Sequence, residues 1–436
     1  MKTSGRTATD IAASLERGLY DGARAPGEPL PTVRGLAADL GVSPATVSSA
    51  YKLLRIRGLV VGGGRRGTRV APRLAAAAAV APPAVPAGTV DLATGNPDPA
   101  LLTPPGPAMQ LIEHELRLYS GQADHPGLTA FASAEFEADG VSGQSVAVLS
   151  GAMDAIERVL REHLRPGDRV AVEDPSFPGI VDLIAASGYG AVPFEMDEQG
   201  PLPDAVAAAL WRGCSAIIVT PRAQNPTGAA IGVERAVELH RVLRDFPDVV
   251  LIENDCAGPI AGAALHTLRD PSQRWWATVR STSKFLGPDL RVAVMVGDEM
   301  TVARVRARQA LGARWVSHIL QQLALALWSD PSSGRRLARA GEIYGYRRNA
   351  ALAALRARNI DVRGTSGFNV WVPVRDEASV VRALADRGWA IAAGERFRLQ
   401  SAPAIRVTIS TLQPRDADRF AEDVADALQP AKTGFA

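Results

Sequence analysis

The residues whose types and spacing most clearly suit a chemical reaction surround one lysine. Lys284 follows a strand-like segment in the order Ser-Thr-Ser-Lys, and a lysine amine can form a Schiff base with an aldehyde cofactor. Ser281 precedes it and Arg291 follows it, and both side chains suit a phosphate. Ser150–Ala152 opens a predicted helix, whose free N–H groups and dipole can bind the same anion. A lysine after a strand is usually only a solvated side chain, so the prediction depends on the combination.

Further polar residues follow other strand-like segments. Asn225 begins the sequence Asn-Pro-Thr-Gly, and Glu253–Cys256 ends the apolar run VVLIE. Near the C-terminus, Arg406 can hold a carboxylate through two parallel hydrogen bonds, although a surface arginine on a strand is the open alternative. Because ligands of parallel sheets bind beyond the carboxyl ends of the strands, we expect these residues to form one site.

Alternating strand-like and helical segments must position these residues. From about residue 90 onward, helical segments are predicted at Ala152–His163, Gly179–Ser187 and Val233–Asp245. They alternate with short apolar runs, namely SVAVLS, RVAVED, AIIVT, VVLIE, TVRSTS and VAVMVG. Repeated βα units with apolar strands predict a mostly parallel sheet covered on both faces.

The N-terminal part has a different organisation. Helices are predicted at Thr9–Tyr20, Val33–Leu40 and about Pro44–Arg57, with Gly41 ending the second helix and Ser43 capping the third. A short helix, a turn containing glycine and a second helix make a helix-turn-helix.

A small hairpin is predicted to follow. LVV and TRVA flank the turn GGGRRG, which carries Arg65 and Arg66. Gly62, Gly64 and Gly67 match the spacing of a dinucleotide-binding loop, but that motif requires a following helix and here a second strand follows. The glycines are therefore interpreted as the tight turn of a wing.

Charge and composition divide the chain further. Residues 1–73 hold 12 Lys+Arg against 5 Asp+Glu, whereas the remainder holds 36 against 41. A basic head on a mildly acidic body indicates that the head meets a polyanion. Together with the helix-turn-helix, this predicts double-stranded DNA as the partner of the head. The Ala/Pro-rich residues 72–88 are typical of a semi-rigid linker. We therefore expect a head at 1–71, a linker at 72–88 and a body at 89–436 with a smaller α+β subdomain from about 330 to 436.

Several classes of protein are disfavoured. Cys214 and Cys256 match no metal-ligand spacing and the six histidines are scattered, so no metal site is predicted. The N-terminus lacks the apolar region of a signal peptide, and no run approaches the roughly 18 apolar residues of a membrane helix. We expect a cytoplasmic protein without a membrane partner.

Residues 7–71 resemble the GntR winged-helix family. The resemblance is carried by the patterns Leu-Pro-x-x-Arg, Val-Ser-x-x-Thr-Val, Ala-Tyr-x-x-Leu and Gly-Thr-x-Val. It implies a wing near the minor groove and phosphate contacts from Arg34, Ser43 and Thr46. Family members often carry an arginine after the serine, where it can read guanine. Pro44 occupies that position here, so base readout must come from other residues.

About residues 90–430 resemble fold-type I aminotransferases, which use pyridoxal 5'-phosphate (PLP). Together with the head, the chain resembles the MocR-type regulators, in which this domain senses an effector as part of a homodimer. The resemblance implies that Lys284 carries PLP, that Arg406 clamps the effector carboxylate and that Tyr119 reaches the phosphate of the partner subunit. The remaining cofactor contacts that it implies are ring contacts from Asn225 and Phe177, and phosphate contacts from Ser281, Arg291 and the backbone amides of Ala152 and Met153.

One strand end departs from the family pattern. Members usually read Glu-Asp-Asp-Tyr, whereas here the order is Glu253-Asn254-Asp255-Cys256. Aligning the motif puts Asn254 beneath the pyridine ring and Cys256 in place of the tyrosine. Because side chains alternate along a strand, a slip of one residue would put Asp255 there instead, and both registers stay open.

These departures bear on activity. A neutral amide beneath the ring predicts slow transamination or none, which favours a PLP-dependent transcription regulator that senses an amino compound or PLP itself. The alternatives are a working aminotransferase with an attached DNA-binding head, and a degenerate domain without cofactor, against which the intact set around Lys284 argues.

Overall fold

The computed structural model describes residues 3–20, 24–25, 27–56, 59–62, 67–70, 85, 88–112, 118–119, 121–142 and 145–429. Of the described residues, those from 3 to 70 belong to one compact unit, and most of the others belong to a second unit. Arg65 and Arg66 of the predicted wing turn, and nearly all of the predicted linker at 72–88, lie outside the described residues.

The head contains three helices and a two-stranded sheet, as the sequence predicts. The helices are α1 (Ala8–Tyr20), α2 (Val33–Leu40) and α3 (Pro44–Ile56), and the antiparallel strands are β1 (Val60–Gly62) and β2 (Thr68–Val70). Gly41 ends α2 in the left-handed region at φ 64, where a residue with a side chain would be strained. The apolar faces of the helices close on one small core, which includes Ile11, Leu15, Leu36, Val47, Tyr51 and Leu54.

The body is built on an eight-stranded sheet in the order β4-β11-β10-β9-β8-β5-β6-β7. Strands β8, β9 and β10 are parallel, whereas β11 runs antiparallel to both β10 and β4. The start of β11 therefore lies at the same edge as the ends of its neighbours. The strand bounds are β4 (Val146–Leu149), β5 (Arg169–Asp174), β6 (Gly190–Asp197), β7 (Gly200–Pro201), β8 (Cys214–Val219), β9 (Val250–Asp255), β10 (Trp276–Ser281) and β11 (Ala293–Gly297).

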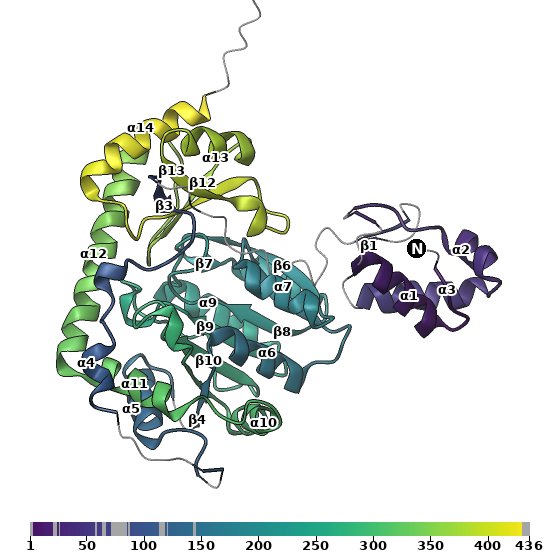
Figure 1. Cartoon of the computed structure of the whole chain (residues 1–436), viewed down its shortest axis with the longest axis horizontal. Helices are drawn as coiled ribbons and strands as arrows, with labels where there is room; N and C mark the ends of the chain where they lie inside the picture. The colour runs from purple at the N-terminus through teal and green to yellow at the C-terminus, as the bar shows by residue number, and fades with distance from the viewer. Residues whose placement is uncertain are drawn as a thin grey trace, which may run out of the picture. The chain divides into compact units, whose positions relative to one another are not determined.

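Helices flank this sheet (Figure 1). α6 packs on β4, β9, β10 and β11, α5 packs on β4 and β11, and α8 packs on β8. The central strands are buried along nearly their whole length, which explains their nearly continuous apolar sequence. The helix bounds are α4 (Gly106–Met109), α5 (Pro126–Ala138), α6 (Ala152–His163), α7 (Pro178–Ala186), α8 (Pro203–Trp211), α9 (Val233–Arg244), α10 (Glu299–Ala310) and α11 (His318–Ser329).

A second, four-stranded sheet forms the smaller part of the body. Its order is β12-β14-β13-β3, with β12 (Asn369–Pro373), β13 (Trp389–Ala393) and β14 (Ala404–Thr408) from the C-terminal region. β3 (Val90–Leu92) comes from the beginning of the body and pairs in parallel with β13. No local sequence pattern predicts this long-range pairing. The helices of this part are α12 (Pro331–Arg356), α13 (Glu377–Ala385) and α14 (Ala417–Leu428).

Two further properties concern only the described residues. No helix among them combines the length and apolar character needed to cross a membrane. Within the same part of the chain, no three His, Cys, Asp or Glu side chains gather as a potential metal site. Cys214 and Cys256 are both free thiols.

Candidate functional site

Lys284 lies in the turn that follows β10. Backbone hydrogen bonds from Thr282 to Val292 and from Leu286 to Thr282 fix this turn. The Lys284 side chain is partly exposed, and its Nζ donates to the Gly95 carbonyl at 2.6 Å. Burial lowers the pKa of the Lys284 amine from its ordinary value. The neutral form, which attacks aldehydes, is therefore more populated than on a solvated lysine.

An anion cradle lies where three neighbouring strands meet the same edge. Ser281 ends β10, and its Oγ accepts from the Ser283 amide at 3.3 Å and donates to Ser283 Oγ at 3.0 Å. Arg291 lies just before β11, and its Nη2 donates to the Ser150 carbonyl at 3.2 Å. Gly151 has φ +101, a backbone conformation that residues with a side chain rarely adopt, and a Cβ there would lie 2.6 Å from Arg291 Nη2.

The same cradle includes the start of α6. Ala152 and Met153 are its first two residues, and the first N–H groups of a helix have no partner within that helix. One guanidinium, two hydroxyl groups and a helix N-terminus therefore converge. This donor set suits a phosphate, and phosphate binding by these residues stays a prediction.

Asn254 and Asp255 point to opposite faces of β9. Asn254 is buried, and among the described residues its Oδ1 has no hydrogen-bond partner. Because it pairs with Val279 in register, Asn254 lies on the face of the sheet that also carries Ser281. A buried acceptor without a donor is costly in a protein interior, and a ligand N–H at this position would satisfy it.

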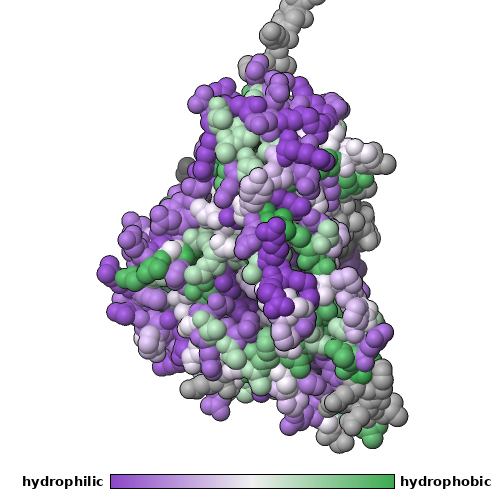
Figure 2. All heavy atoms as spheres, turned by 90° about the vertical axis from the view of Figure 1, so that its left-hand side faces the viewer, coloured by the Kyte–Doolittle hydropathy of each residue, from purple (hydrophilic) through white to green (hydrophobic). Residues whose placement is uncertain are grey.

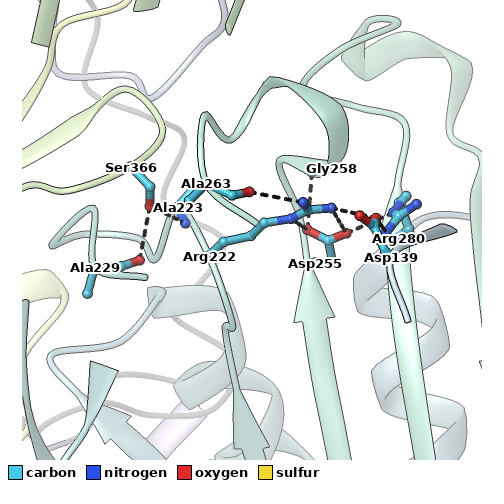
Figure 3. A network of polar contacts seen from close by, with 9 residues as sticks. All are labelled: Asp139, Arg222, Ala223, Ala229, Asp255, Gly258, Ala263, Arg280 and Ser366. Carbon is cyan, nitrogen blue, oxygen red and sulfur yellow. Dashed lines mark hydrogen bonds and ion pairs between the residues drawn. The ribbon is translucent and has the colours of Figure 1, made fainter. Parts of the chain in front are cut away.

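Asp255 is fully engaged on the other face (Figure 3). Arg222 donates to its two carboxylate oxygens at 2.9 Å each, and Arg280 donates from Nε at 2.7 Å. Asp139 completes the cluster, because it accepts from Arg222 Nη2 at 3.0 Å and also from Arg280. The Gly258 amide is a further donor to Asp255.

The charges in this cluster fix the protonation state of Asp255. Burial opposes its ionisation, but the charges of Arg280 and Arg222 outweigh burial and lower its pKa to about 2. The carboxylate is therefore ionised and held by the two arginines. This geometry favours Asn254 over Asp255 as the side chain that faces a ring at the site.

The four-residue cluster was not predicted from the sequence. Asp139 lies 83 residues from Arg222 and 141 residues from Arg280, so no local pattern relates them. One signal was available: Arg280 interrupts the apolar strand around TVRSTS, and a charged residue in a buried strand needs a charged partner.

Arg406 projects from β14 and is 4% exposed. Its Nη1 donates to Asn225 Oδ1 at 3.3 Å, its Nη2 donates to the Ala93 carbonyl, and the Phe397 ring lies 4.8 Å from its guanidinium carbon. Among the described residues, its Nε has no acceptor. Burial lowers the pKa of Arg406 to about 10. An incompletely paired, buried guanidinium suits a carboxylate, and the predicted grouping with Asn225 is present.

The other predicted site residues differ in their surroundings. Cys256 is partly exposed next to the end of β9, and burial raises the pKa of its thiol to about 11. Phe177 is 38% exposed immediately before α7. Tyr119 is 77% exposed; its ring packs edge-on against Trp315 at 5.7 Å and lies 4.9 Å from the guanidinium carbon of Arg314. Within the described part of one chain, these contacts connect Tyr119 to Trp315 and Arg314 and not to the cradle.

The head presents a second candidate site. Arg34 is exposed in the first turn of α2, and Ser43 Oγ accepts from the Thr46 amide at 3.1 Å and so caps α3. A concavity of about 700 Å³ lies between α2, α3 and β2. The side chains that line it include Arg34, Ser48, Ser49, Lys52 and Arg55. The exposed face of α3 is therefore polar and basic, which suits a DNA groove.

Comparisons with known protein families match two separate parts of the chain. Residues 90–424 match the family described as aminotransferase class I and II, and residues 7–70 match the bacterial regulatory proteins of the gntR family. The chain is 36% identical over 433 residues to the vitamin B6 salvage pathway transcriptional repressor PtsJ of Salmonella typhimurium. That match covers 97% of this chain and 99% of the relative.

A more distant relative and a solved structure are also similar to this chain. The HTH-type pyridoxine biosynthesis transcriptional regulator PdxR of Corynebacterium glutamicum is 25% identical over 403 residues, covering 87% of this chain and 86% of its own. Among solved structures, the α-aminoadipate aminotransferase LysN of Thermus thermophilus superposes with a TM-score of 0.69 at 24% identity. It covers 78% of this chain and 92% of its own, and it establishes the fold of the body.

Proposed function

Because the chain belongs to the gntR family of bacterial regulators and to the aminotransferase class I and II family, we propose that a ligand bound in the body changes how the head engages DNA. The chain is a MocR-type, PLP-dependent transcription regulator, and the relatives that match most of its length are named as a transcriptional repressor and a transcriptional regulator. Two of those relatives are named for vitamin B6 salvage and pyridoxine biosynthesis. PLP itself is therefore the first effector to test, and an amino compound captured at the same site is the second.

PLP is the cofactor that the aminotransferase fold of the body indicates. When bound, it supplies an aldehyde that captures amines and a pyridine ring that withdraws electrons from them. Under our proposal Ser281, Arg291 and the amides of Ala152 and Met153 hold the phosphate. Lys284 presents its amine to the aldehyde, and Phe177 stacks on the ring.

The main observation in favour of a sensing role is the contrast between Asn254 and Asp255. Asn254 can accept a hydrogen bond from a ring N–H through its unpartnered Oδ1, but it contributes no negative charge. Asp255 could contribute charge, yet two arginines hold its carboxylate on the other face. The residues thus bind and orient a ligand while giving little stabilisation to negative charge that develops next to the ring. Slow turnover suits a protein that must retain its effector.

Arg406 and Asn225 complete the ligand site under this proposal. Arg406 would clamp the carboxylate of an amino compound by two N–H groups, and Asn225 orients that guanidinium while it faces the ring hydroxyl. Cys256 occupies the place of the family's tyrosine. Its raised pKa keeps it a neutral thiol, which is a weak hydrogen-bond donor.

We also propose that the chain acts as a homodimer. Large apolar side chains are exposed around α4, α11 and the region before α5, including Met109, Leu111, Leu118, Tyr119 and Ile319. On the face of the body that carries α4 and α12, hydrophobic residues gather in patches among hydrophilic ones (Figure 2). Burial of such patches is a typical function of subunit interfaces. A partner would also give the exposed Tyr119 a phosphate to contact.

DNA affinity with and without PLP tests the proposal. A labelled duplex, selected from a random pool by the full chain, is titrated with protein by fluorescence anisotropy while sedimentation reports the oligomeric state. We expect saturating PLP to change the Kd severalfold in the dimer, and Lys284→Ala to remove that change. A wild-type Kd that is the same with and without PLP, and with a panel of amino acids added, would contradict the proposed function.

A further inference from the structure

The segment that follows β3 is a compact turn with its own internal bonds. The Asp91 carboxylate accepts hydrogen bonds from the Ala93 amide at 2.9 Å and the Thr94 amide at 3.0 Å, and also from the Thr94 hydroxyl. Asn96 Nδ2 donates to Thr94 Oγ1 at 2.9 Å. These bonds make residues Asp91–Asn96, named here the β3 turn, move as one piece.

Two residues of the ligand site hold the β3 turn from one side. Lys284 Nζ donates to the Gly95 carbonyl at 2.6 Å, and Arg406 Nη2 donates to the Ala93 carbonyl. Gly95 has φ +72, and a Cβ there would lie 3.0 Å from Arg406 Nη1, so the turn approaches the guanidinium closely. The amine and the guanidinium that the proposed function assigns to the ligand are therefore already engaged with this turn.

Other contacts hold the β3 turn on its far side. Ser410 Oγ donates to the Asn96 carbonyl at 2.7 Å, and Thr411 Oγ1 donates to the Asp91 carbonyl at 3.2 Å. Neither Ser410 nor Thr411 belongs to the cradle or to the aldehyde position. Loss of the bonds from Lys284 and Arg406 would consequently shift the turn and leave it attached.

The β3 turn also follows the first strand of the body after the head. Residues 72–88 lead from the head towards β3, and β3 continues directly into the turn. The pairing of β3 with β13 is only three residues long, from Val90 to Leu92. Val90 also donates to the Gly388 carbonyl at 2.9 Å, so this short strand is the described segment through which a shift of the turn would reach the linker.

We propose that the β3 turn is the relay through which the ligand site controls the DNA-binding head, and this inference rests on the proposed function. Ligand and turn compete for the same two side chains. A carboxylate on Arg406 displaces the Ala93 carbonyl, and capture of an aldehyde by Lys284 releases the Gly95 carbonyl. The freed turn shifts and repositions β3, which changes the constraint on the linker.

The covalent half of this competition follows from atom balance. The Lys284 ammonium first loses a proton to solvent. Its nitrogen then bonds to the aldehyde carbon, and both hydrogens of the neutral amine leave with the aldehyde oxygen as water. The neutral imine nitrogen that results carries no N–H for the Gly95 carbonyl, so the 2.6 Å bond would be lost. An unpaired carbonyl in a partly buried position favours rearrangement of its segment.

Hydrogen exchange of the full chain tests the relay without reference to DNA. Peptides covering residues 90–98 are compared with and without PLP. We expect PLP to accelerate amide exchange in this segment severalfold, and Lys284→Met to show the faster exchange already without PLP. Exchange that PLP leaves unchanged or slows in the segment would overturn the relay.

DNA binding by two variants separates the relay from the proposed function. Thr94→Val removes the hydroxyl bond to Asp91 and the acceptor of Asn96 Nδ2, and Asp91→Ala removes the three bonds that Asp91 accepts. We expect Thr94→Val to keep the absorption spectrum of bound PLP and the PLP-free Kd, but to lose most of the PLP-induced change in Kd. Thr129→Val, on α5 and away from the turn, is the matched control and should respond like the wild type.

The outcomes are distinguishable. If the wild type responds to PLP and both turn variants respond equally, the relay is wrong while the proposed function stands. If the wild type shows no response with any ligand, the proposed function fails, and the exchange of residues 90–98 still decides whether the ligand site moves the turn. Should Asp91→Ala fail to fold, Thr94→Val alone carries the comparison.

Discussion

The two faces of the sheet at the ends of β9 and β10 differ in whether their buried polar side chains have partners. On one face Asp255 is buried and paired with both Arg222 and Arg280. Arg280 also pairs with Asp139. On the other face Asn254 is also buried, but its amide oxygen has no partner among the described residues. Paired buried groups hold one structure in place, whereas an unpaired buried acceptor is suited to receive a ligand donor.

Removal of Lys284 should have the largest effect, namely the loss of covalent PLP addition. Lys284→Ala eliminates the amine that both the sequence and the structure place next to the cradle. After incubation with PLP and borohydride, intact-mass analysis should show covalent addition to the wild type and none to the variant. Equal addition to both proteins would show that another residue is the attachment point.

Neutralising Asp255 tests how much its ion pairs with Arg222 and Arg280 stabilise the fold. Asp255→Asn leaves two buried guanidinium groups with Asp139 as their main partner, and we expect a loss of about 3–5 kcal/mol in the free energy of unfolding. Urea denaturation measures the loss. Glu342→Gln, which breaks an exposed pair with Arg339, is the control and should cost about 0–1 kcal/mol.

The pH dependence of that stabilisation has a defined sign. The folded-state pKa of Asp255 lies at about 2, below its ordinary value of 3.8. Its contribution is therefore fully present above about pH 4 and is lost as the pH falls towards 2. A wild-type minus Asp255→Asn difference in stability that stays constant from about pH 5 to about pH 2.5 would contradict the ion-pair assignment.

Glu173 sharpens the comparison, because it is a buried carboxyl whose described hydrogen-bond donors are neutral. It accepts from the Thr220 amide at 2.7 Å and from Gln224 Nε2 at 3.0 Å, and burial raises its pKa to about 7. Its folded pKa exceeds the ordinary 4.5, so its contribution to stability is fully present below pH 4.5 and is lost as the pH rises through 7. Between about pH 5 and pH 7.5, the free energy of unfolding of the wild type should fall by roughly 2 kcal/mol more than that of Glu173→Gln. An unchanged profile would contradict the shifted pKa.

A negative charge in place of the Asn254 amide should raise the rate of amino-group transfer. Asn254→Asp puts a carboxylate where the unpartnered amide oxygen lies, and we expect the rate of amino-group transfer from L-alanine to rise about tenfold, equivalent to about 1.4 kcal/mol. The assay follows pyruvate formation per mole of folded, PLP-loaded protein. Asp255→Asn is the control and should leave this rate nearly unchanged; the reverse pattern would show that the register is misassigned.

The smallest expected effect lies in the head. Arg34→Ala removes an exposed cation at the start of α2 and should weaken binding to all duplexes alike by about fivefold, because phosphate contacts carry no sequence information. The slope of log K against log salt should fall by about 0.9. Arg339→Ala, an exposed arginine of the body, is the control. A loss confined to particular base pairs would make Arg34 a reader of bases.

Local patterns predicted most of the secondary structure. Apolar runs indicated the strands β4, β5, β8, β9, β10 and β11 to within a few residues, and α2 and α6 begin and end where the sequence predicts. Strands β4, β8, β9 and β10 run in one direction, as the βα alternation indicates, but the antiparallel direction of β11 is invisible in its sequence. An apolar strand has the same composition in either direction when both faces are buried.

The candidate site was predicted less completely. Ser281, Lys284 and Arg291 are close in sequence, so the turn between β10 and β11 was enough to relate them. The Arg222–Asp255–Arg280–Asp139 cluster and the contacts of the β3 turn join residues far apart in the chain. Which of Asn254 and Asp255 faces the ligand could not be decided from alternation alone, because alternation fixes that they differ and not which way each points.

The sequence by itself indicated a head and a body, the grouping of Lys284 with the neighbours that we propose bind phosphate, and the basic character of the head. These follow from residue types and short spacings, which act locally. Only the tertiary structure decided the surroundings of Asn254 and Asp255, and only it placed the Gly95 and Ala93 carbonyls against Lys284 and Arg406. The physical reason is that burial and ion pairing are set by strands brought together from distant parts of the chain, and no local pattern encodes that approach.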